Sequence, residues 1–317
     1  MPEPVAIRTR GLTKTYGDLF AVADLDLDVM VGEVFGFLGP NGAGKTTTIR
    51  ALLNYLRPTA GSAEVLGLDA VADSVELRHR IGYTPSEYEM YDNLTGAEMI
   101  RYYANLRGGV DESFVMELAG RLKADLGKRM REYSTGNKQK IGLIQAFMSR
   151  PELLILDEPS TGLDPLMQHE LQSMIREVAD EGRTVFLSSH TLSEVERVAD
   201  RVGILRHGRL VEVETVASLR SKAIRRIDFE FSEPVDAAVF ASLPAVRSAE
   251  GTARLVSVSY DGDVAEVLRA ALEHGVVNLN SREADLEEIF LAYYRDPSAP
   301  GDGGSGGDGG VTEDGSA

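Results

Sequence analysis

Eight consecutive residues, Gly39 to Thr46, have the types and spacing needed to bind phosphate. They match the pattern G-x-x-x-x-G-K-[ST] and lie between an apolar run, 34–38, and a helical pattern over 46–56. Glycines let backbone N–H groups turn toward phosphate oxygens, and a helix N-terminus adds partial positive charge. We expect Lys45 to bridge the β- and γ-phosphates of ATP and the Thr46 hydroxyl to bind Mg²⁺. The expected nucleotide-binding residues here are Gly39, Pro40, Asn41, Gly42, Ala43, Gly44, Lys45, Thr46 and Thr47.

Two adjacent carboxylates follow a second apolar run and supply what a phosphate loop lacks. Residues 153–156 read Leu-Leu-Ile-Leu and lead into Asp157 and Glu158. Open α/β sheets bind ligands at the carboxyl ends of their strands. We expect Asp157 to hold Mg²⁺, directly or through water, and Glu158 to polarise the attacking water. Adjacent acids at a strand end can also be merely solvated, but their pairing with the phosphate loop favours ATP hydrolysis.

With these motifs in place, the sequence resembles the ATP-binding-cassette (ABC) ATPases over roughly residues 5–220. Residues 133–139, Tyr-Ser-Thr-Gly-Asn-Lys-Gln, are similar to the family's LSGGQ signature, and 157–164 to its joined Walker B motif and D-loop. The resemblance implies that His190, after the strand-like run 184–189, is the switch histidine that senses the γ-phosphate. It also implies that Tyr16 stacks on adenine.

The resemblance implies a dimer, because the family's signature binds the γ-phosphate held by the opposite subunit. Ser134 and the N–H of Gly136 would make that contact, at the start of a helix expected over 138–150. The chain has one phosphate loop and one signature. A second ATPase subunit, either another copy of this chain or a paralogue, is therefore expected.

The chain departs from the family pattern in two places. Tyr133, Thr135 and Asn137 replace the signature's leucine, first glycine and glutamine, while the phosphate-contacting Ser134 and Gly136 remain. In a separate loop, Ser86 stands where the family usually has a glutamine that contacts Mg²⁺ and water. A serine hydroxyl has a shorter reach and fewer donors than a glutamine amide. We expect metal binding to depend on Thr46 and Asp157 and not on Ser86.

Alternating strand-like and helix-like runs predict the architecture that positions these residues. Residues 1–222 are expected to form an α/β nucleotide-binding domain, the P-loop NTPase cassette of the ABC family, with a helical signature subdomain at about 90–150. Residues 223–295 are expected to form a small α+β domain that ends in an amphipathic helix over 285–295. The last 22 residues, 296–317, hold eight glycines and five acidic residues and are expected to be disordered.

A group of tyrosines falls before and within the helical subdomain. Packing in the core is the favoured interpretation, and a docking surface for a partner is the alternative. The residues are Tyr83, Tyr88, Tyr91, Tyr102 and Tyr103.

Composition excludes several classes of protein. The 317 residues include no cysteine, so disulfides and thiolate chemistry are excluded. The formal net charge of −17 disfavours a general attraction to nucleic acid, which is not expected as a partner. No apolar stretch reaches the roughly 18 residues of a membrane span, and the N-terminus does not read as a secretory signal.

These observations predict the Mg²⁺-dependent ATPase subunit of an ABC transporter whose membrane-spanning subunits are encoded separately. The chain is then expected in the cytoplasm, held at the inner face of the cell membrane by those partners. A single cassette, an appended domain and the ending over 286–294 resemble bacterial drug, antibiotic or lipid exporters. Two alternatives remain: a soluble ABC ATPase that acts on ribosomes or DNA, and a regulatory protein that binds ATP without useful turnover.

Overall fold

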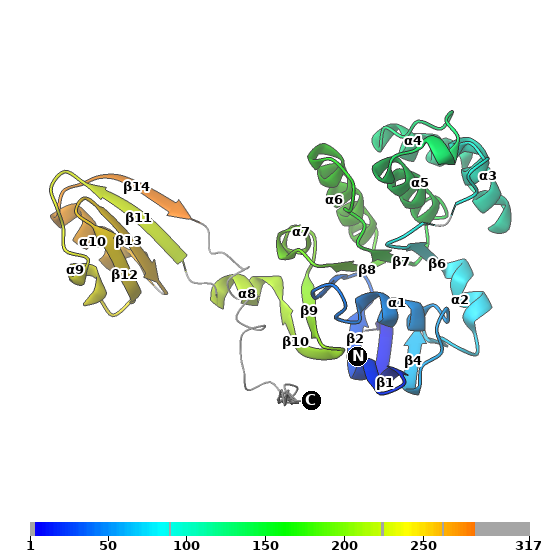
Figure 1. Cartoon of the computed structure of the whole chain (residues 1–317), viewed down its shortest axis with the longest axis horizontal. Coiled ribbons are helices and arrows are strands. Elements are labelled where there is room, and N and C mark those ends of the chain that lie inside the picture. The colour runs from blue at the N-terminus through cyan, green and yellow to red at the C-terminus, as the bar shows by residue number, and fades with distance from the viewer. Residues whose placement is uncertain (1–3, 89, 223–224, 262, 283–317) are drawn as a thin grey trace, which may run out of the picture.

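The computed structural model describes residues 4–88, 90–222, 225–261 and 263–282. Its strands form three sheets, and Figure 1 shows the third sheet beyond helix α8 (Val216–Lys222), apart from the other two. We call residues 225–282, which contain that third sheet, the C-terminal unit. The amphipathic helix expected over 285–295 and the tail 296–317 lie outside the described residues.

A six-stranded, mainly parallel sheet forms the centre of residues 4–222. Three of its strands are buried at every position, as expected for strands covered on both faces, and their sequences are nearly continuous apolar runs. The strands lie in the order β10 (Arg209–Thr215), β9 (Arg201–Arg206), β3 (Val34–Leu38), β8 (Thr184–Ser189), β7 (Leu153–Asp157) and β6 (Ile81–Thr84). Because β3, β8 and β7 are parallel neighbours, the segments that follow them meet at one edge.

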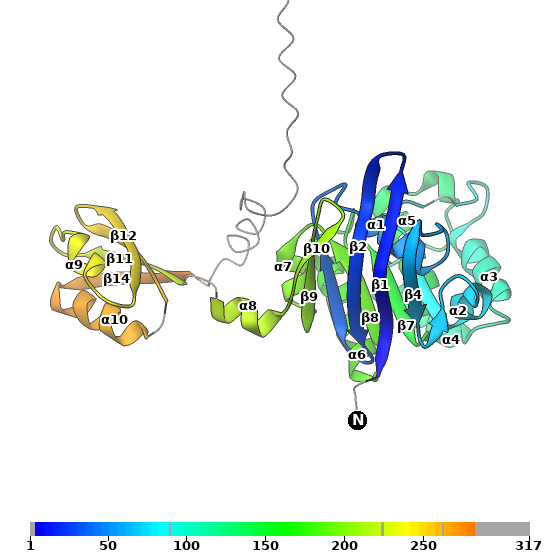
Figure 2. The same ribbon diagram turned by 90° about the horizontal axis from the view of Figure 1, so that it is seen from below.

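An antiparallel sheet packs on the other side of helix α1 (Lys45–Leu52). Its order is β2 (Leu19–Met30), β1 (Val5–Tyr16), β4 (Ala60–Val65) and β5 (Leu68–Asp69). Figure 2 shows this sheet in front and the parallel strands behind it. Helix α1 contacts β2 and β4 on one side and β7 on the other. The helix that carries the phosphate loop is therefore clamped between two sheets.

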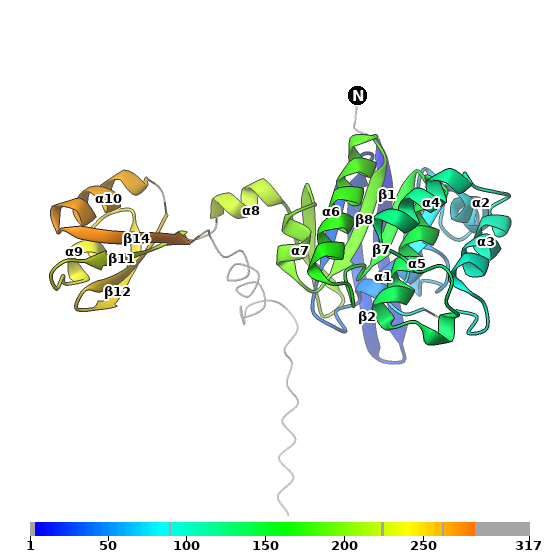
Figure 3. The same ribbon diagram turned by 90° about the horizontal axis from the view of Figure 1, so that it is seen from above.

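A helical subdomain covers the far face of the parallel sheet, as Figure 3 shows. Side chains cap its helices: Thr95 forms a capping box with Glu98, and Asp111 accepts from two backbone N–H groups. The helices are α3 (Gly96–Leu106), α4 (Glu112–Arg121), the short 3₁₀ turn η1 (Met130–Glu132) and α5 (Thr135–Phe147). Three further helices lie outside this subdomain: α2 (Ser74–Arg80), α6 (Pro165–Asp180) and α7 (Leu192–Glu196).

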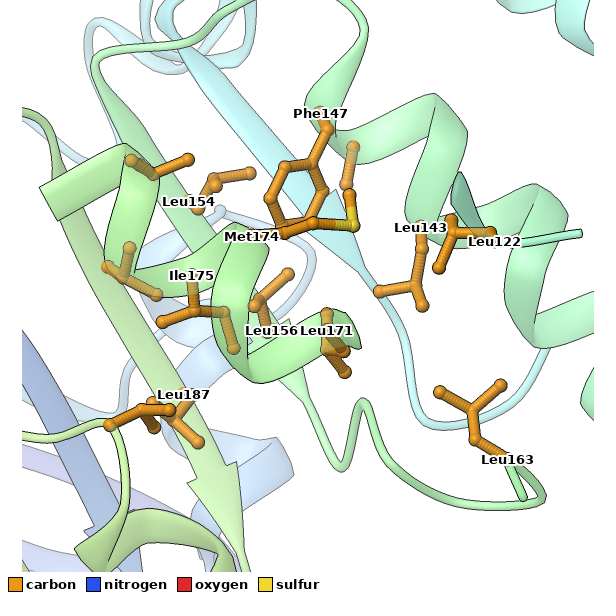
Figure 4. Packing of buried hydrophobic residues seen from close by; sticks show 14 of the residues in the cluster. Leu122, Leu143, Phe147, Leu154, Leu156, Leu163, Leu171, Met174, Ile175 and Leu187 are labelled. Carbon is orange, nitrogen blue, oxygen red and sulfur yellow. The ribbon is translucent and has the colours of Figure 1, made fainter. Parts of the chain in front are cut away.

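The core under these helices is continuous with the site-bearing strands. Figure 4 shows Phe147 of α5 and Met174 of α6 packed beside Leu154 of β7. Leu156, which directly precedes Asp157, lies in the same buried cluster. Close packing of this kind fixes the end of β7 to within a narrow range of positions.

The C-terminal unit has its own sheet and core. Its elements alternate as strand, helix, strand, strand, helix, strand, and the sheet order is β12-β13-β11-β14, the βαββαβ arrangement. Alternate residues of β11 (Ile227, Phe229 and Phe231) pack against Phe240 in a separate cluster. The elements are β11 (Arg225–Phe231), α9 (Ala238–Ala241), β12 (Val246–Thr252), β13 (Leu255–Tyr260), α10 (Val264–Glu273) and β14 (Val276–Arg282). The domain boundary at 222/223 stays a prediction.

The structure corrects three expectations about element bounds and packing. Helix α1 ends at Leu52, not near residue 56, and Asn54 beyond it has a positive φ. The signature helix α5 begins at Thr135, not at residue 138, because the Ser134 side chain caps it. Core packing is wrong for two of the tyrosines, since Tyr91 is 58% exposed and Tyr102 is 38% exposed.

Candidate functional site

The phosphate loop is held open by its backbone contacts. Gly44 has a φ of +108°, and a Cβ atom there would lie 2.3 Å from the carbonyl oxygen of Ala21, so only glycine fits. The N–H of Gly39 donates to the carbonyl of Ser189, and that of Ala43 donates to the carbonyl of Pro40. In the described part of the chain, the N–H groups of Asn41, Gly42 and Gly44 donate no hydrogen bond. Free N–H groups ahead of a helix N-terminus fit a phosphate.

Lys45 is buried inside this loop, with its side chain only 6% exposed. Its Nζ atom donates to the carbonyl of Gly39 at 2.6 Å and to that of Pro40 at 3.2 Å. It also forms an ion pair with Oε1 of Glu158 at 3.1 Å. The buried cation is therefore paired with a carboxylate from the end of the next strand but one in the sheet.

Glu158 connects this lysine to His190. The carboxylate Oε2 lies 2.7 Å from Nδ1 of His190, whose side chain is 51% exposed. Glu158 itself has a φ of +51°, in the left-handed region that non-glycine residues rarely adopt. Strain of this kind is retained where the surrounding structure fixes it, often at functional sites. The structure thus brings Lys45, Glu158 and His190 into one chain of contacts.

Asp157 is fully buried and only half satisfied. Its Oδ1 accepts a hydrogen bond from the Ser188 hydroxyl at 2.6 Å. Its Oδ2 is buried and has no hydrogen-bond partner among the described residues. Buried carboxylate oxygens are normally paired, and an orphaned one suits a cation or an ordered water. With the Thr46 hydroxyl at the start of α1, this oxygen fits Mg²⁺, which proteins usually bind through one or two carboxylates plus substrate phosphates.

Ser134 and Gly136 lie at the start of α5, where Ser134 is exposed and Gly136 is half-buried. The structure places them against the segment after Glu158. A Cβ atom on Gly136 would lie 2.2 Å from the carbonyl oxygen of Gly162. Three residues further along α5, the buried Gln139 side chain donates to the carbonyl of Pro159 at 2.8 Å. The start of α5 and the segment 159–162 of the same chain are therefore in direct contact.

Tyr16, the expected adenine-stacking residue, ends strand β1 with 54% of its surface exposed. The Nζ atom of Lys14 lies 5.2 Å from the centre of its ring, a cation–π contact. An exposed aromatic face supported from one side is available to a flat ligand.

Five tyrosines lie just after α1, on β6, and before and within α3, and their rings make two groups of contacts. Tyr55 packs against Tyr83 with ring centres 5.8 Å apart, and Tyr102 contacts both Tyr91, at 5.4 Å, and Tyr103, at 5.7 Å. Three of the five are exposed: Tyr55, Tyr91 and Tyr102. We call these five residues the tyrosine band. Exposed clustered aromatics are typical of binding surfaces.

Comparison of the sequence with known proteins points to a family that binds ATP. The family model described as ABC transporter matches residues 22–161. The bacitracin transport ATP-binding protein of Enterococcus faecalis is 36% identical over 294 residues, which cover 90% of this chain and 94% of the relative. The chain belongs to the ABC transporter ATP-binding proteins.

Other relatives support the same family. The daunorubicin/doxorubicin resistance ATP-binding protein of Streptomyces peucetius is 33% identical over 310 residues, covering 92% of this chain and 93% of that protein. A solved ATP-binding subunit of an ABC transporter has a TM-score of 0.62 and 31% identity, and the match covers 68% of this chain and 92% of that structure. The predicted cassette fold and ABC family are confirmed, and nothing in the comparisons supports the ribosome or DNA alternative.

The structure explains one departure from the family's signature. Tyr133 replaces leucine, and its hydroxyl hydrogen-bonds the carbonyl of Asp125 while lying against Gly96, the first residue of α3. Glycine at position 96 leaves room for the ring. The larger side chain therefore joins the signature of this ABC protein to the start of a neighbouring helix.

Two residues beside the site were not expected from the sequence of this ABC protein. Gln139 is the last residue of the signature-like segment 133–139 and had no expected role, and Ser188 is the next-to-last residue of strand β8, two before His190. Ser188 directly follows the apolar run 185–187, whereas Gln139 lies between two lysines and has no such signal. Both are buried, and both form hydrogen bonds with the segment 157–159.

Proposed function

We propose that this chain hydrolyses Mg²⁺·ATP in a dimer of ATPase subunits and powers separately encoded membrane subunits that export a drug-like compound. The contact chain from Lys45 through Glu158 to His190, beside the free Oδ2 of Asp157, carries the catalytic part of the proposal. Those groups provide a cation for phosphate, a carboxylate for water and a buried oxygen for metal at one edge of the sheet.

We assign each of these residues a separate role in ATP hydrolysis. The free N–H groups of the phosphate loop and Lys45 bind the phosphates, and the Tyr16 ring stacks on adenine. Thr46 and Asp157 would hold Mg²⁺, which neutralises charge on the β- and γ-phosphates. Glu158, freed from Lys45 by the incoming phosphate, orients a water for attack and accepts its proton. His190 holds the other oxygen of Glu158 and can contact the γ-phosphate.

The second half of each site would come from another ATPase subunit. Ser134 is exposed at the N-terminus of α5, where a helix favours an anion. One phosphate loop and one signature per chain then require two subunits around two ATP molecules. Turnover per subunit should rise with protein concentration at low concentration. A turnover that stays flat across the range in which dimers form would contradict this arrangement.

Export rests on the relatives, whose names include bacitracin transport and daunorubicin/doxorubicin resistance. None of the helices in the described ranges has the length and apolar character needed to cross a membrane. We therefore assign the passage of the compound to partner subunits and place this chain at the cytoplasmic face of the membrane. We further propose residues 1–222 as the nucleotide-binding domain and 223–295 as a domain for regulation or assembly.

The tyrosine band is our proposed docking surface for the membrane subunit. Tyr91 and Tyr102 contact each other edge-on and are exposed, so replacing both by alanine removes apolar surface without opening the core. The double variant should keep ATP hydrolysis but lose copurification with an integral-membrane protein from membranes solubilised in mild detergent. Met116→Ala, which also removes an exposed apolar side chain, is the control. Tyr260→Ala would not serve, because Tyr260 is buried in the C-terminal unit.

The metal assignment has its own test. Thr46→Ala should impair Mg²⁺-dependent hydrolysis strongly, whereas Ser86→Ala should leave it within a few-fold. Loss of turnover in Ser86→Ala would show that the serine takes part in metal binding.

Deletion of 223–317 should leave nucleotide binding largely intact. Loss of nucleotide binding in a folded deletion protein would mean that this region completes the site.

A further inference from the structure

The side chain of Ser188 contacts the carboxylate of Asp157 and the backbone N–H of Glu158. Ser188 is on β8, directly opposite Asp157 of β7 on one side and Phe37 of β3 on the other. It is fully buried, in a strand that is otherwise mostly apolar. A buried hydroxyl costs free energy unless it is hydrogen-bonded, so its partners indicate why it is tolerated.

This hydroxyl donates one hydrogen bond and accepts another, and its partners are the adjacent residues Asp157 and Glu158. Oγ donates its single proton to Oδ1 of Asp157 at 2.6 Å. It accepts from the backbone N–H of Glu158 at 3.1 Å. The directions are fixed, because a carboxylate can only accept and an N–H can only donate.

These two bonds have different consequences. The bond to Oδ1 fixes the rotation of the Asp157 carboxylate and leaves Oδ2 as the free oxygen. The N–H of Glu158, whose φ is +51°, is shared between Oγ of Ser188 and the Ser188 backbone carbonyl, which lies 3.2 Å away. One hydroxyl therefore orients the Asp157 carboxylate and adds a second contact to the strained backbone that carries the Glu158 side chain.

We propose that Ser188 is a positioning residue that sets the geometry of Asp157 for Mg²⁺ and of Glu158 for water. This inference rests on the proposed ATPase function. Ser188 itself would touch neither metal nor nucleotide. Partners that orient a metal-binding carboxylate typically affect metal affinity or activity by about 10- to 100-fold when removed.

The test compares Ser188→Ala with a matched loss of a hydroxyl at the opposite end of the same strand. Thr184 is also buried, and its Oγ1 accepts from the N–H of Gly32, far along the strand from the acids. Thr184→Val removes that hydroxyl while keeping the side-chain shape. Ser188→Thr keeps a hydroxyl at position 188. Each full-length variant is checked for folding by its thermal melting curve.

Three measurements separate a positioning role from general damage to the fold. Affinity for Mn²⁺, measured by electron paramagnetic resonance in the presence of ATP at 4 °C, should fall about tenfold or more in Ser188→Ala. Steady-state kcat should fall by a similar factor, with affinity for a fluorescent ATP analogue in EDTA unchanged. Thr184→Val should match wild type in all three measurements. Ser188→Thr should recover most of the Mn²⁺ affinity.

Any of four results would overturn the inference. Three are wild-type Mn²⁺ affinity in Ser188→Ala, an equal loss in Thr184→Val, and a loss of metal-free nucleotide affinity in Ser188→Ala. The fourth is a folded Ser188→Thr protein with no recovery of Mn²⁺ affinity. Absence of ATP hydrolysis by the wild-type dimer would instead contradict the proposed function, so the two failures are distinguishable.

Discussion

Nζ of Lys45 and Oε1 of Glu158 lie 3.1 Å apart, so the proposed phosphate-binding cation and the proposed water-orienting carboxylate form an ion pair with each other. Both side chains are largely buried, at 6% and 14% exposure. A phosphate that takes over Lys45 must break this ion pair. Binding of ATP would thereby release Glu158 at the moment when its carboxylate is needed.

Lys45→Ala should weaken ATP binding by about tenfold or more, because a charge-assisted contact to phosphate is lost. It should also lower the melting temperature, since the buried Glu158 carboxylate loses its cation. Titration with a fluorescent ATP analogue and a thermal melt measure the two effects. Lys128→Ala, at an exposed position, serves as the control. Unchanged ATP affinity in Lys45→Ala would remove the basis for the phosphate-loop assignment.

Glu158→Gln should lower kcat by about 100-fold or more, because glutamine keeps the shape but cannot accept the proton. ATP should bind at least as tightly as in wild type, since the competing ion pair with Lys45 is gone. An ATP-stabilised dimer should appear in size-exclusion chromatography. Glu152→Gln, just before β7, is the matched control. Near-normal hydrolysis by Glu158→Gln would exclude this residue as the base.

Gly136→Ala should disturb the catalytic segment, because its Cβ atom would lie 2.2 Å from the backbone carbonyl oxygen of Gly162. We expect a loss of about 1–3 kcal/mol in unfolding free energy and a fall in kcat. Gly120→Ala is the matched control, since it is also helical but has nothing within 4 Å of the added atom. That change should be neutral or stabilising by up to about 1 kcal/mol. Urea unfolding and ATPase rates test both, and equal effects in the two variants would refute the contact.

Arg121 of α4 holds two glutamates of α6, and this ion-pair network predicts a pH dependence of stability. The hydrogen bonds from Arg121 lower the pKa of Glu177 below its ordinary value of 4.5. A lowered pKa in the folded state gives stability that is present above the unfolded pKa and lost as pH falls through the folded pKa. Because Glu177 is 49% exposed, solvent screening limits the effect to about 1 kcal/mol or less.

Glu177→Gln should therefore lower the urea midpoint at pH 7, and the difference from wild type should shrink below about pH 4.5. Glu117→Gln, on an exposed part of α4, should show no such dependence. A difference that stays constant from pH 7 to the acid limit of folding would show that charge on Glu177 does not contribute.

The sequence predicts the central sheet well because its strands are buried on both faces. Continuous apolar runs such as 153–156 and 185–187 are typical of strands covered on both faces. The edge strands β12 and β14 carry mixed, exposed residues, so their sequences show no alternation of apolar and polar residues. They form because they pair with β13 and β11 in the folded protein. They were not predicted for that reason.

The motifs locate the candidate site in the chain, but they do not show its contacts. Glu158 and His190 are 32 residues apart, and their contact depends on the register between β7 and β8. The same register places Ser188 opposite Asp157. A shift of one residue would turn the hydroxyl to the other face of the sheet, and no local pattern in the sequence specifies which register forms.

The C-terminal unit begins and ends at one place. Arg226 near the start of β11 is paired with Arg282 at the end of β14, and neighbouring strands are only about 5 Å apart. The two ends of the unit therefore lie side by side, as they do in a domain inserted into another chain. A short turn could span the distance between residues 226 and 282 without moving the chain at residue 222. We expect that a chimera with a foreign module joined at these two points would keep the same spacing between its ends.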